Sequence, residues 1–213
     1  VAHFLERGLR AAGLRTGLYT SPHLSDWRER ARVDGEPAAD EDYRRAFAAV
    51  LDAAGPGATF FDLMTAAAFL VFRARGCDWW VIETGLGGRF DSTNVLAPAA
   101  AVVTSIELEH VDVLGPDLPA IAREKAGIFK AGARSWSGLV PGHPARPALA
   151  AAAAAAGGVL RELPEEVECR ADLPYPQPPM RRNFALARAI LLDLAATGGG
   201  GPALATAAAE LAR

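Results

Sequence analysis

The chain has 213 residues, of which 51% are hydrophobic, so it can bury a full core in one domain spanning residues 1–213. Its net charge of −3 gives no basic field for nucleic acid or an anionic membrane. The longest apolar stretches, such as residues 148–156, are too short to cross a bilayer. Two distant cysteines, Cys77 and Cys169, form neither a disulfide framework nor a zinc motif. We therefore expect a monomer of the reducing cytoplasm.

Taken in chain order, apolar runs suited to buried strands alternate with helical patterns. The chain starts at Val1 and opens at once on a helix, in which Phe4, Leu5 and Leu9 share a face, so we interpret its beginning as truncated. Alternation of this kind predicts an α/β fold, a mostly parallel sheet with helices on both faces. The predicted strands are 16–20, 79–83, 100–105 and a weaker 158–161, and the predicted later helices are 40–53, 62–75, 118–129, 147–156 and 182–196.

The segment 81–94 carries the strongest chemical signal. Glu83 is the first charged residue after the apolar run 79–82, at the strand end where α/β proteins bind ligands, and is a candidate magnesium ligand. The plain alternative is an acid that ends a strand in water. The glycines and polar side chains of residues 85–94 then offer close backbone approach and oxygen ligands to a phosphate or metal. The segment is no dinucleotide fingerprint, and no G-x-x-x-x-G-K-[ST] loop occurs in the chain.

Three further candidates follow other predicted strands or lie on a helix. Ser21 follows the strand 16–20 and can complete a magnesium shell, although Ser-Pro is also an ordinary turn. His110 follows the strand 100–105, but magnesium prefers oxygen ligands and a lone histidine is more often structural. Lys125 belongs to an Arg-Glu-Lys run whose plain interpretation is a solvated helix face.

The order of these segments is more specific than any one of them. The run TSPHL, VIETGLGGRFDSTN, TSIELEH and IAREKAGI resembles the Mur ligase superfamily, and within it folylpolyglutamate synthase, including the bifunctional dihydrofolate synthase form. The resemblance covers nearly the whole chain. It implies a Mur-ligase central domain, which is P-loop NTPase-like, in an ATP-dependent acid–amino-acid ligase of folate biosynthesis and one-carbon metabolism.

The resemblance also implies a chemistry and a set of residues. In that family ATP phosphorylates a carboxylate of a folate-type acceptor, and the amine of L-glutamate displaces the phosphate, with Mg²⁺ stabilising the charge. Ser21 and Glu83 match the ligands of one magnesium, and Glu83 and His110 match those of a second. Lys125 matches a lysine that the family carries as a carbamate, which makes it a catalytic candidate together with Glu83 and His110.

Acceptor and nucleotide contacts follow from the same match. Asn183 resembles an asparagine used toward the nucleotide, although residues 177–180 read Gln-Pro-Pro-Met where the family usually has Gly-x-His-Gln. Phe60 and Phe61 could instead be core residues at a helix start. The acceptor contacts implied by the resemblance are Thr59, Phe60, Phe61, Asp62, Phe90, Asp91 and Ser92.

Two alternatives remain open at this stage. One is a Mur-type ligase that acts on a UDP-sugar cell-wall precursor. The other is a non-catalytic fragment, because the family's P-loop should lie immediately before Val1 and its C-terminal glutamate-ligase domain should follow Arg213. We expect residues 1–213 alone to bind ATP poorly and to be inactive, while the acceptor, dihydropteroate or a reduced folate, is left open.

Overall fold

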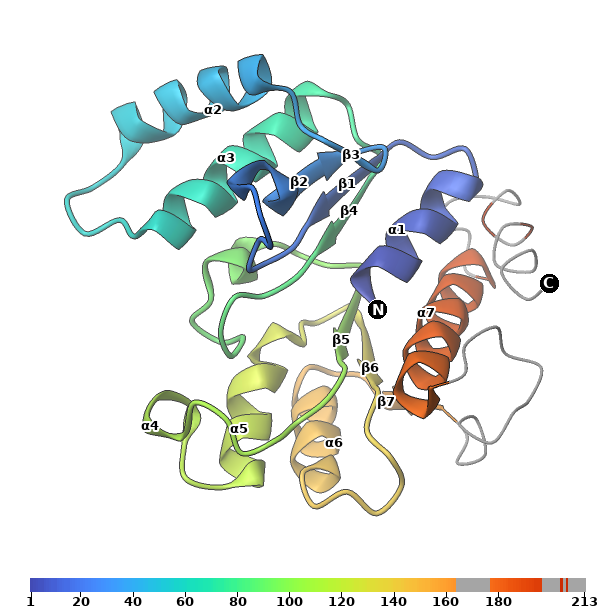
Figure 1. The fold of residues 1–213 in the computed structure, drawn as a ribbon. Coiled ribbons are helices and arrows are strands. Elements are labelled where there is room, and N and C mark those ends of the chain that lie inside the picture. The colour runs from blue at the N-terminus through green and yellow to red at the C-terminus, as the bar shows by residue number, and fades with distance from the viewer. Residues whose placement is uncertain (164–176, 197–203, 205, 207–213) are drawn as a thin grey trace.

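The computed structural model describes residues 1–163, 177–196, 204 and 206, so Cys169 lies outside the described residues. Figure 1 shows the arrangement of the elements. In chain order these are α1 (Ala2–Ala11), β1 (Thr16–Tyr19), η1 (Trp27–Arg30), β2 (Ala31–Val33), β3 (Glu36–Pro37), α2 (Asp40–Ala53), α3 (Phe60–Ala74), β4 (Trp79–Ile82), η2 (Ser92–Val95), β5 (Ala100–Val103), α4 (Val111–Leu114), α5 (Leu118–Lys125), η3 (Ala126–Ile128), β6 (Arg134–Ser137), α6 (Arg146–Ala155), β7 (Leu160–Glu162) and α7 (Pro178–Ala196).

The strands form two sheets where the sequence predicted one. In the first, β1 pairs parallel with β4 and antiparallel with β2, which pairs with β3, whereas β5, β6 and β7 form a second sheet that is entirely parallel. The hairpin of β2 and β3 was not predicted, because both strands are very short. The dipeptide Asp34-Gly35 is the sequence signal that could have indicated it. Both residues have positive φ, as an Asp-Gly two-residue hairpin requires.

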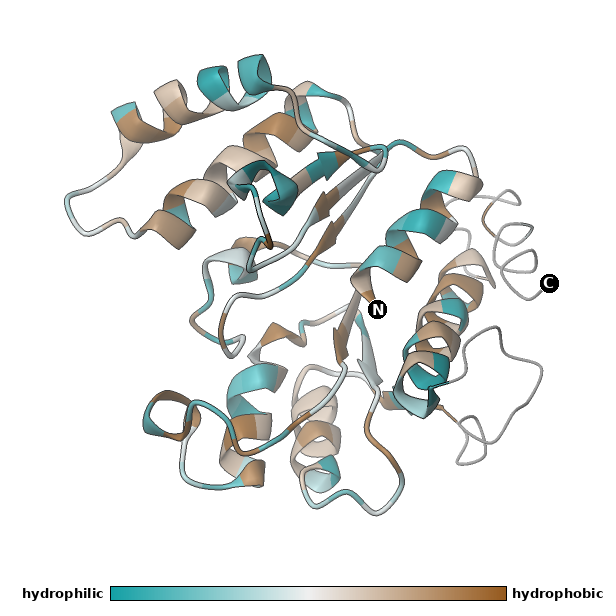
Figure 2. Cartoon of the chain, viewed as in Figure 1, coloured by the Kyte–Doolittle hydropathy of each residue, from teal (hydrophilic) through white to brown (hydrophobic). Residues whose placement is uncertain are grey.

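Helices cover both faces of the strands, as predicted. Alternate residues of β4 point to opposite sides: Trp80 and Ile82 join the core under α2 and α3, whereas Trp79 and Val81 join the core under α1 and α7. The second core also takes Ala100 and Val102 of β5, so it spans both sheets. Figure 2 shows hydrophobic colour on these central strands and hydrophilic residues on the outer turns of α1 and α2.

The second sheet has a core of its own on the opposite face. Ala101 and Val103 of β5 pack there with Ile121 of α5 and Leu149 of α6, and the last two are fully buried. Burying an aliphatic side chain of this size stabilises the fold by about 1.5–3 kcal/mol. The alanine-rich α6 therefore packs one face against this core and exposes its other faces.

Predicted boundaries hold within a few residues, with two informative errors. The last helix begins at Pro178, four residues before the predicted start, because proline is tolerated in a first turn. Strand β6 was missed, since its sequence RSWS lacks an apolar run, yet Ser135 and Ser137 are buried in it. Among the described residues, no helix combines the length and apolar character needed to cross a membrane.

Candidate active site at the ends of the parallel strands

The carboxyl ends of β1 and β4 bring Ser21 and Glu83 together. The two strands run parallel with Tyr19 opposite Ile82, and the N–H of Glu83 extends the ladder by donating to the carbonyl of Tyr19 at 2.9 Å. The backbone N–H of Ser21 then donates to Oε2 of Glu83 at 3.0 Å. The two residues predicted to share a magnesium therefore meet at one edge of the sheet, as the parallel pairing requires.

This pair has the donor chemistry that magnesium prefers. Glu83 is exposed, and the hydrogen bonds found among the described residues use its Oε2 and not its Oε1. A carboxylate and a serine hydroxyl are hard oxygen ligands, and Mg²⁺ keeps several waters or phosphate oxygens besides one or two protein ligands. The residues present fit the ion.

His110 is placed less directly. It precedes α4 with a left-handed φ of 49°, and no hydrogen bond or ion pair joins it to Glu83 in the described part of the chain. Within that part, no three His, Cys, Asp or Glu side chains gather into a ready metal-binding group. The second metal, shared by Glu83 and His110, stays a prediction.

The glycine-rich loop after Glu83 is folded around one carboxylate. Oδ2 of Asp91 accepts the N–H groups of Gly85 and Leu86 at 2.8 and 2.9 Å, and its Oδ1 accepts the N–H and hydroxyl of Thr93 at 3.0 and 2.6 Å. Both oxygens of Asp91 are thus engaged within the loop. Its predicted contact with the acceptor remains untested, but its structural role is to close this turn.

Two glycines let the loop pack closely on its neighbours. A Cβ on Gly85 would lie 2.5 Å from the ring of Phe61, and one on Gly88 would lie 2.5 Å from the carbonyl oxygen of Lys125. The next residue, Arg89, donates its N–H to the carbonyl of Glu124 at 2.9 Å. The loop that follows Glu83 therefore packs on the last turn of α5, which carries Lys125.

The polar side chains Arg89 and Asn94, at the end of the loop, also bond to the segment that carries α5 and η3. Nε of Arg89 lies 3.3 Å from Oε1 of Glu124, and Nδ2 of Asn94 donates to the carbonyls of Arg89 and Gly127 at 2.9 and 3.2 Å. The sequence suggested that these donors face a ligand. In the structure they hold the loop against α5 and η3.

A pocket of about 570 Å³ opens beside the Ser21–Glu83 pair. Five of the predicted residues line it: Ser21, Phe61, Phe90, Asp91 and Ser92. The loop glycines Gly85, Gly87 and Gly88, which the sequence indicated for close backbone approach, also line it. The sequence did not propose the remaining lining residues as ligand contacts: Pro22, Arg30, Leu86, Val113, Leu114 and Glu124. Phe90, with 89% of its surface exposed, presents an open aromatic face at this pocket.

Three other predicted residues do not line this pocket and lie at the start of α3: Thr59, Phe60 and Asp62. Thr59 and Asp62 form a capping box, with the Thr59 hydroxyl accepting from the Asp62 N–H and the Asp62 carboxylate accepting from the Thr59 N–H at 2.7 Å. The carboxylate also accepts a short hydrogen bond from the hydroxyl of Ser92. These bonds, first from Ser92 and then from Thr59, lower the pKa of Asp62. Asp62 thus positions Ser92 at the pocket.

Lys125 is not part of a solvated helix face. Its side chain is only 20% exposed, and Nζ lies 2.7 Å from Oε1 of Glu109. The hydrogen bond and charge of Lys125 lower the pKa of Glu109. The plain interpretation of the Arg-Glu-Lys run holds for Arg123, which is exposed, and is wrong for Lys125.

Comparison with known proteins agrees with this geometry. No family model matches the chain. Over 157 residues the chain is 42% identical to the dihydrofolate synthase/folylpolyglutamate synthase of Escherichia coli K12, a match that covers 73% of this chain. Its structure superimposes on E. coli FolC in complex with DHPP and ADP with a TM-score of 0.78, at 33% identity and over 97% of this chain. The chain belongs to the folylpolyglutamate and dihydrofolate synthase family.

Two other relatives carry the same family name. The Bacillus subtilis dihydrofolate synthase/folylpolyglutamate synthase is 42% identical over 137 residues, covering 61% of this chain. A bifunctional folylpolyglutamate synthase/dihydrofolate synthase with Mn, AMPPNP and L-glutamate bound matches with a TM-score of 0.68 and 39% identity over 75% of this chain. The chain spans 36% of the E. coli synthase sequence, 32% of the Bacillus synthase and 53% of the superimposed E. coli chain.

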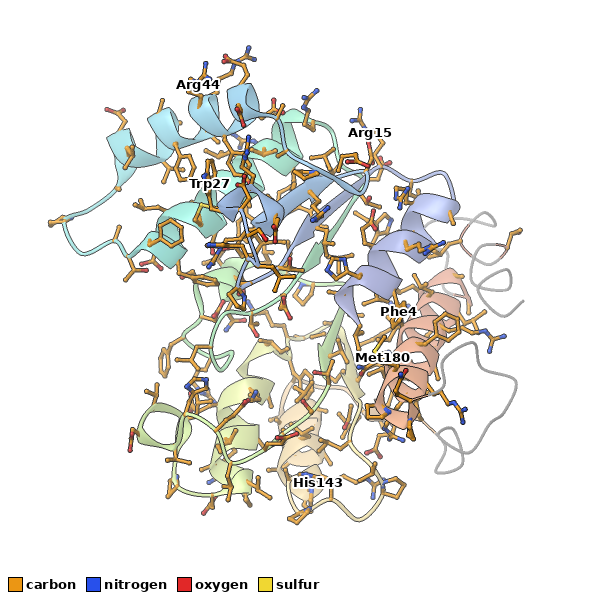
Figure 3. The ribbon with its side chains drawn as sticks, viewed as in Figure 1. Phe4, Arg15, Trp27, Arg44, His143 and Met180 are labelled. Atoms are coloured by element: carbon orange, nitrogen blue, oxygen red, sulfur yellow. The ribbon has the colours of Figure 1, made fainter. Side chains whose placement is uncertain are left out.

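Asn183, the predicted nucleotide contact of this synthase family, lies on α7. The neighbouring Phe184 packs edge-on against Phe4 of α1, with ring centroids 5.4 Å apart, and Figure 3 marks Phe4 between the two helices. None of the described residues that line the pocket beside the Ser21–Glu83 pair comes from α7. A nucleotide role for Asn183 therefore remains a prediction, and it would place the nucleotide outside this pocket.

Proposed function

We propose that this chain is the ATP- and Mg²⁺-handling part of a ligase that adds L-glutamate to a folate-type acceptor. The observation that carries the proposal is the Ser21–Glu83 pair, which lies beside a pocket walled by Phe61 and Phe90. An oxygen-ligand pair suits a metal and its phosphates, and aromatic faces suit a flat heterocycle. The relatives bind corresponding molecules, namely DHPP with ADP in one and Mn, AMPPNP and L-glutamate in another.

The reaction that this site would support has two steps. A carboxylate oxygen of the acceptor attacks the γ-phosphorus of ATP, and the bond to ADP breaks, which leaves an acyl phosphate. The amine of L-glutamate then attacks the acyl carbon, inorganic phosphate leaves with its bonding electrons, and the nitrogen gives up one proton to the departing phosphate, so an amide remains. Bound Mg²⁺ would supply the stabilisation of phosphate charge, held by Ser21 and Glu83. The pocket orients the acceptor so that its carboxylate meets the phosphate.

The proposal also covers the domain organisation, the oligomeric state and the cellular location of the protein. We take residues 1–213 as one domain, since the core under α1 and α7 draws on both sheets, and the protein as a monomer. We also place it in the cytoplasm, where ATP is made and where thiols such as the free Cys77 stay reduced.

The test is ADP release by the full-length protein, measured with ATP, Mg²⁺, L-glutamate and an acceptor. We expect release that depends on both glutamate and either dihydropteroate or tetrahydrofolate. A UDP-sugar acceptor is the matched negative control, since a Mur-type ligase would use it instead. Absence of ADP release with every pteroate and folate acceptor would refute the proposal.

A further inference from the structure

Arg30 lines the pocket but does not follow the end of a predicted strand. It closes η1 and precedes β2, and its carbonyl accepts the N–H of Thr20 at 3.0 Å. The adjacent Ser21 donates to Glu83. The backbone of Arg30 thus lies one hydrogen bond away from the strand end that carries the metal pair, and its side chain lines the same pocket.

Two side chains, His23 and Phe60, contact its guanidinium. Nε donates to Nδ1 of His23 at 2.9 Å, and the guanidinium carbon lies 5.4 Å from the ring centroid of Phe60, within cation–π range. The positive charge of Arg30 also acts on the buried Tyr19, whose pKa is raised by burial despite the opposing effects of Thr65 and Arg30. These contacts fix the orientation of Arg30 and leave its charge uncompensated.

The other charged groups of the pocket are already paired. Asp91 is bonded on both oxygens within its loop, and Glu124 lies against Arg89. No Asp or Glu among residues 1–163 and 177–196 forms an ion pair with Arg30. Arg30 is half-buried at this pocket. A ligand that fills the pocket displaces water from the guanidinium, and this favours an anionic group on the ligand, because an unpaired charge away from water is costly.

We propose that Arg30 binds a carboxylate of the acceptor, an inference that rests on the proposed function and assigns one contact within it. The planar guanidinium fork matches a carboxylate in bidentate geometry. The aromatic residues Phe61 and Phe90 occupy the same pocket, so the flat part and the anionic end of one molecule are recognised together. During turnover Arg30 stays hydrogen-bonded to the carboxylate, and it gives and takes no proton.

The acceptor offers two kinds of carboxylate. Dihydropteroate has only the carboxylate that reacts, whereas tetrahydrofolate also has the α-carboxylate of its glutamate, which does not react. The same chemistry at Arg30 could serve either one. An Arg30 variant tested on both acceptors distinguishes them: a defect with both acceptors indicates the reacting carboxylate, and a defect with tetrahydrofolate alone indicates the α-carboxylate.

The experiment compares Arg30→Gln and Arg30→Lys with Arg44→Gln in the full-length protein. Arg44 lies on the outer side of α2 with its side chain 74% exposed (Figure 3). Its one ion pair within the described part of the chain is with its helix neighbour Glu41, so it controls for the loss of one positive charge. For Arg30→Gln we expect the KM of an acceptor to rise about 10- to 100-fold, the range for losing a hydrogen bond to a charged group. Lysine should restore part of the loss, since it keeps the charge but not the fork.

A binding measurement keeps the test independent of turnover. Fluorescence titration with dihydropteroate and tetrahydrofolate, and with their carboxamides in place of the carboxylates, should show tighter binding of an acid than of its amide by the wild type. Arg30→Gln should bind acid and amide equally, at an unchanged melting temperature. Equal binding of acid and amide by the wild type, or a change confined to the KM of ATP, would overturn the assignment. A wild type that discriminates acid from amide but releases no ADP would count against the proposed function alone.

Discussion

Nζ of Lys125 lies 2.7 Å from Oε1 of Glu109, in an ion pair whose lysine side chain is only 20% exposed. A carbamate on Lys125 would replace this attraction with the repulsion of two anions at the same distance. The observed ion pair and the predicted carbamate are therefore two alternative states of one side chain. The second requires Glu109 to turn away or a cation to lie between the two groups.

This relationship makes a prediction for Lys125. Lys125→Ala should lower the rate of ADP release by about 100-fold or more, the usual cost of removing an electrostatic group from an active site. Small carboxylates such as acetate should restore part of the rate by replacing the carbamate. Lys125→Arg should be equally slow, because arginine keeps the cation beside Glu109 but cannot form a carbamate.

Glu109→Gln is the control for a simple ion pair. If Lys125 acts only by pairing with Glu109, the glutamine variant should lose as much activity as Lys125→Ala. We expect it to lose much less. Wild-type rates in Lys125→Ala would show that neither role matters to turnover.

The second prediction concerns the metal pair. Glu83→Gln keeps an oxygen to accept the N–H of Ser21 but removes the negative charge, so the fold should persist while magnesium binding weakens. The Mg²⁺ concentration that gives half-maximal ADP release should rise at least about 10-fold, the lower range for disturbing even an outer partner of a metal ligand. Ser21→Ala, which keeps the backbone N–H, should show a smaller shift. An unchanged Mg²⁺ dependence in both variants would remove them from the metal site.

A third prediction tests the close packing of the glycine-rich loop on α5. Gly88→Ala places a Cβ 2.5 Å from the Lys125 carbonyl oxygen, a backbone atom that cannot move cheaply. We expect the free energy of unfolding to fall by about 1–3 kcal/mol, as for other overpacked sites, with a loss of activity as α5 shifts. Gly57→Ala is the matched control, since no atom lies within 4 Å of its Cβ. Similar denaturation midpoints for the two variants would show that the loop is not held on α5.

The fourth prediction is a pH dependence of stability. Tyr43 is 1% exposed, accepts the N–H of Ala31 at 3.1 Å and donates to the carbonyl of Arg28 at 3.2 Å. Burial raises its pKa to about 12. The unfolded chain releases this proton near pH 10, so the stability that Tyr43 contributes is complete below pH 10 and is lost as pH rises toward 12.

Ultraviolet absorbance of tyrosinate during alkaline titration would follow this group. The late component should lose the contribution of one tyrosine in Tyr43→Phe, since the buried Tyr19 also has a raised pKa, and the alkaline fall in the denaturation midpoint should become shallower. A titration near pH 10 for Tyr43 in the folded protein would contradict the burial argument.

The sequence by itself determined the site's principal parts. Apolar runs that end in Ser21 and Glu83 place both residues at strand ends, and parallel strands bring their carboxyl ends to one edge, so the pair was predictable without coordinates. The helices on both faces were predictable for the same reason, because period and burial follow local pattern. The family, too, was identified from the order and spacing of the segments.

Only the tertiary structure decided what each polar group of the site does. Asp91 and Asn94 look like ligand groups in sequence, but their partners lie within the loop and on η3, at distances set by packing. Lys125 looks solvated until Glu109 and the loop cover it. Arg30 lines the pocket because η1 leads into β2, a very short strand that pairs with β1. Local pattern is a short-range property, whereas the partner of a polar side chain is fixed by segments that are distant in sequence.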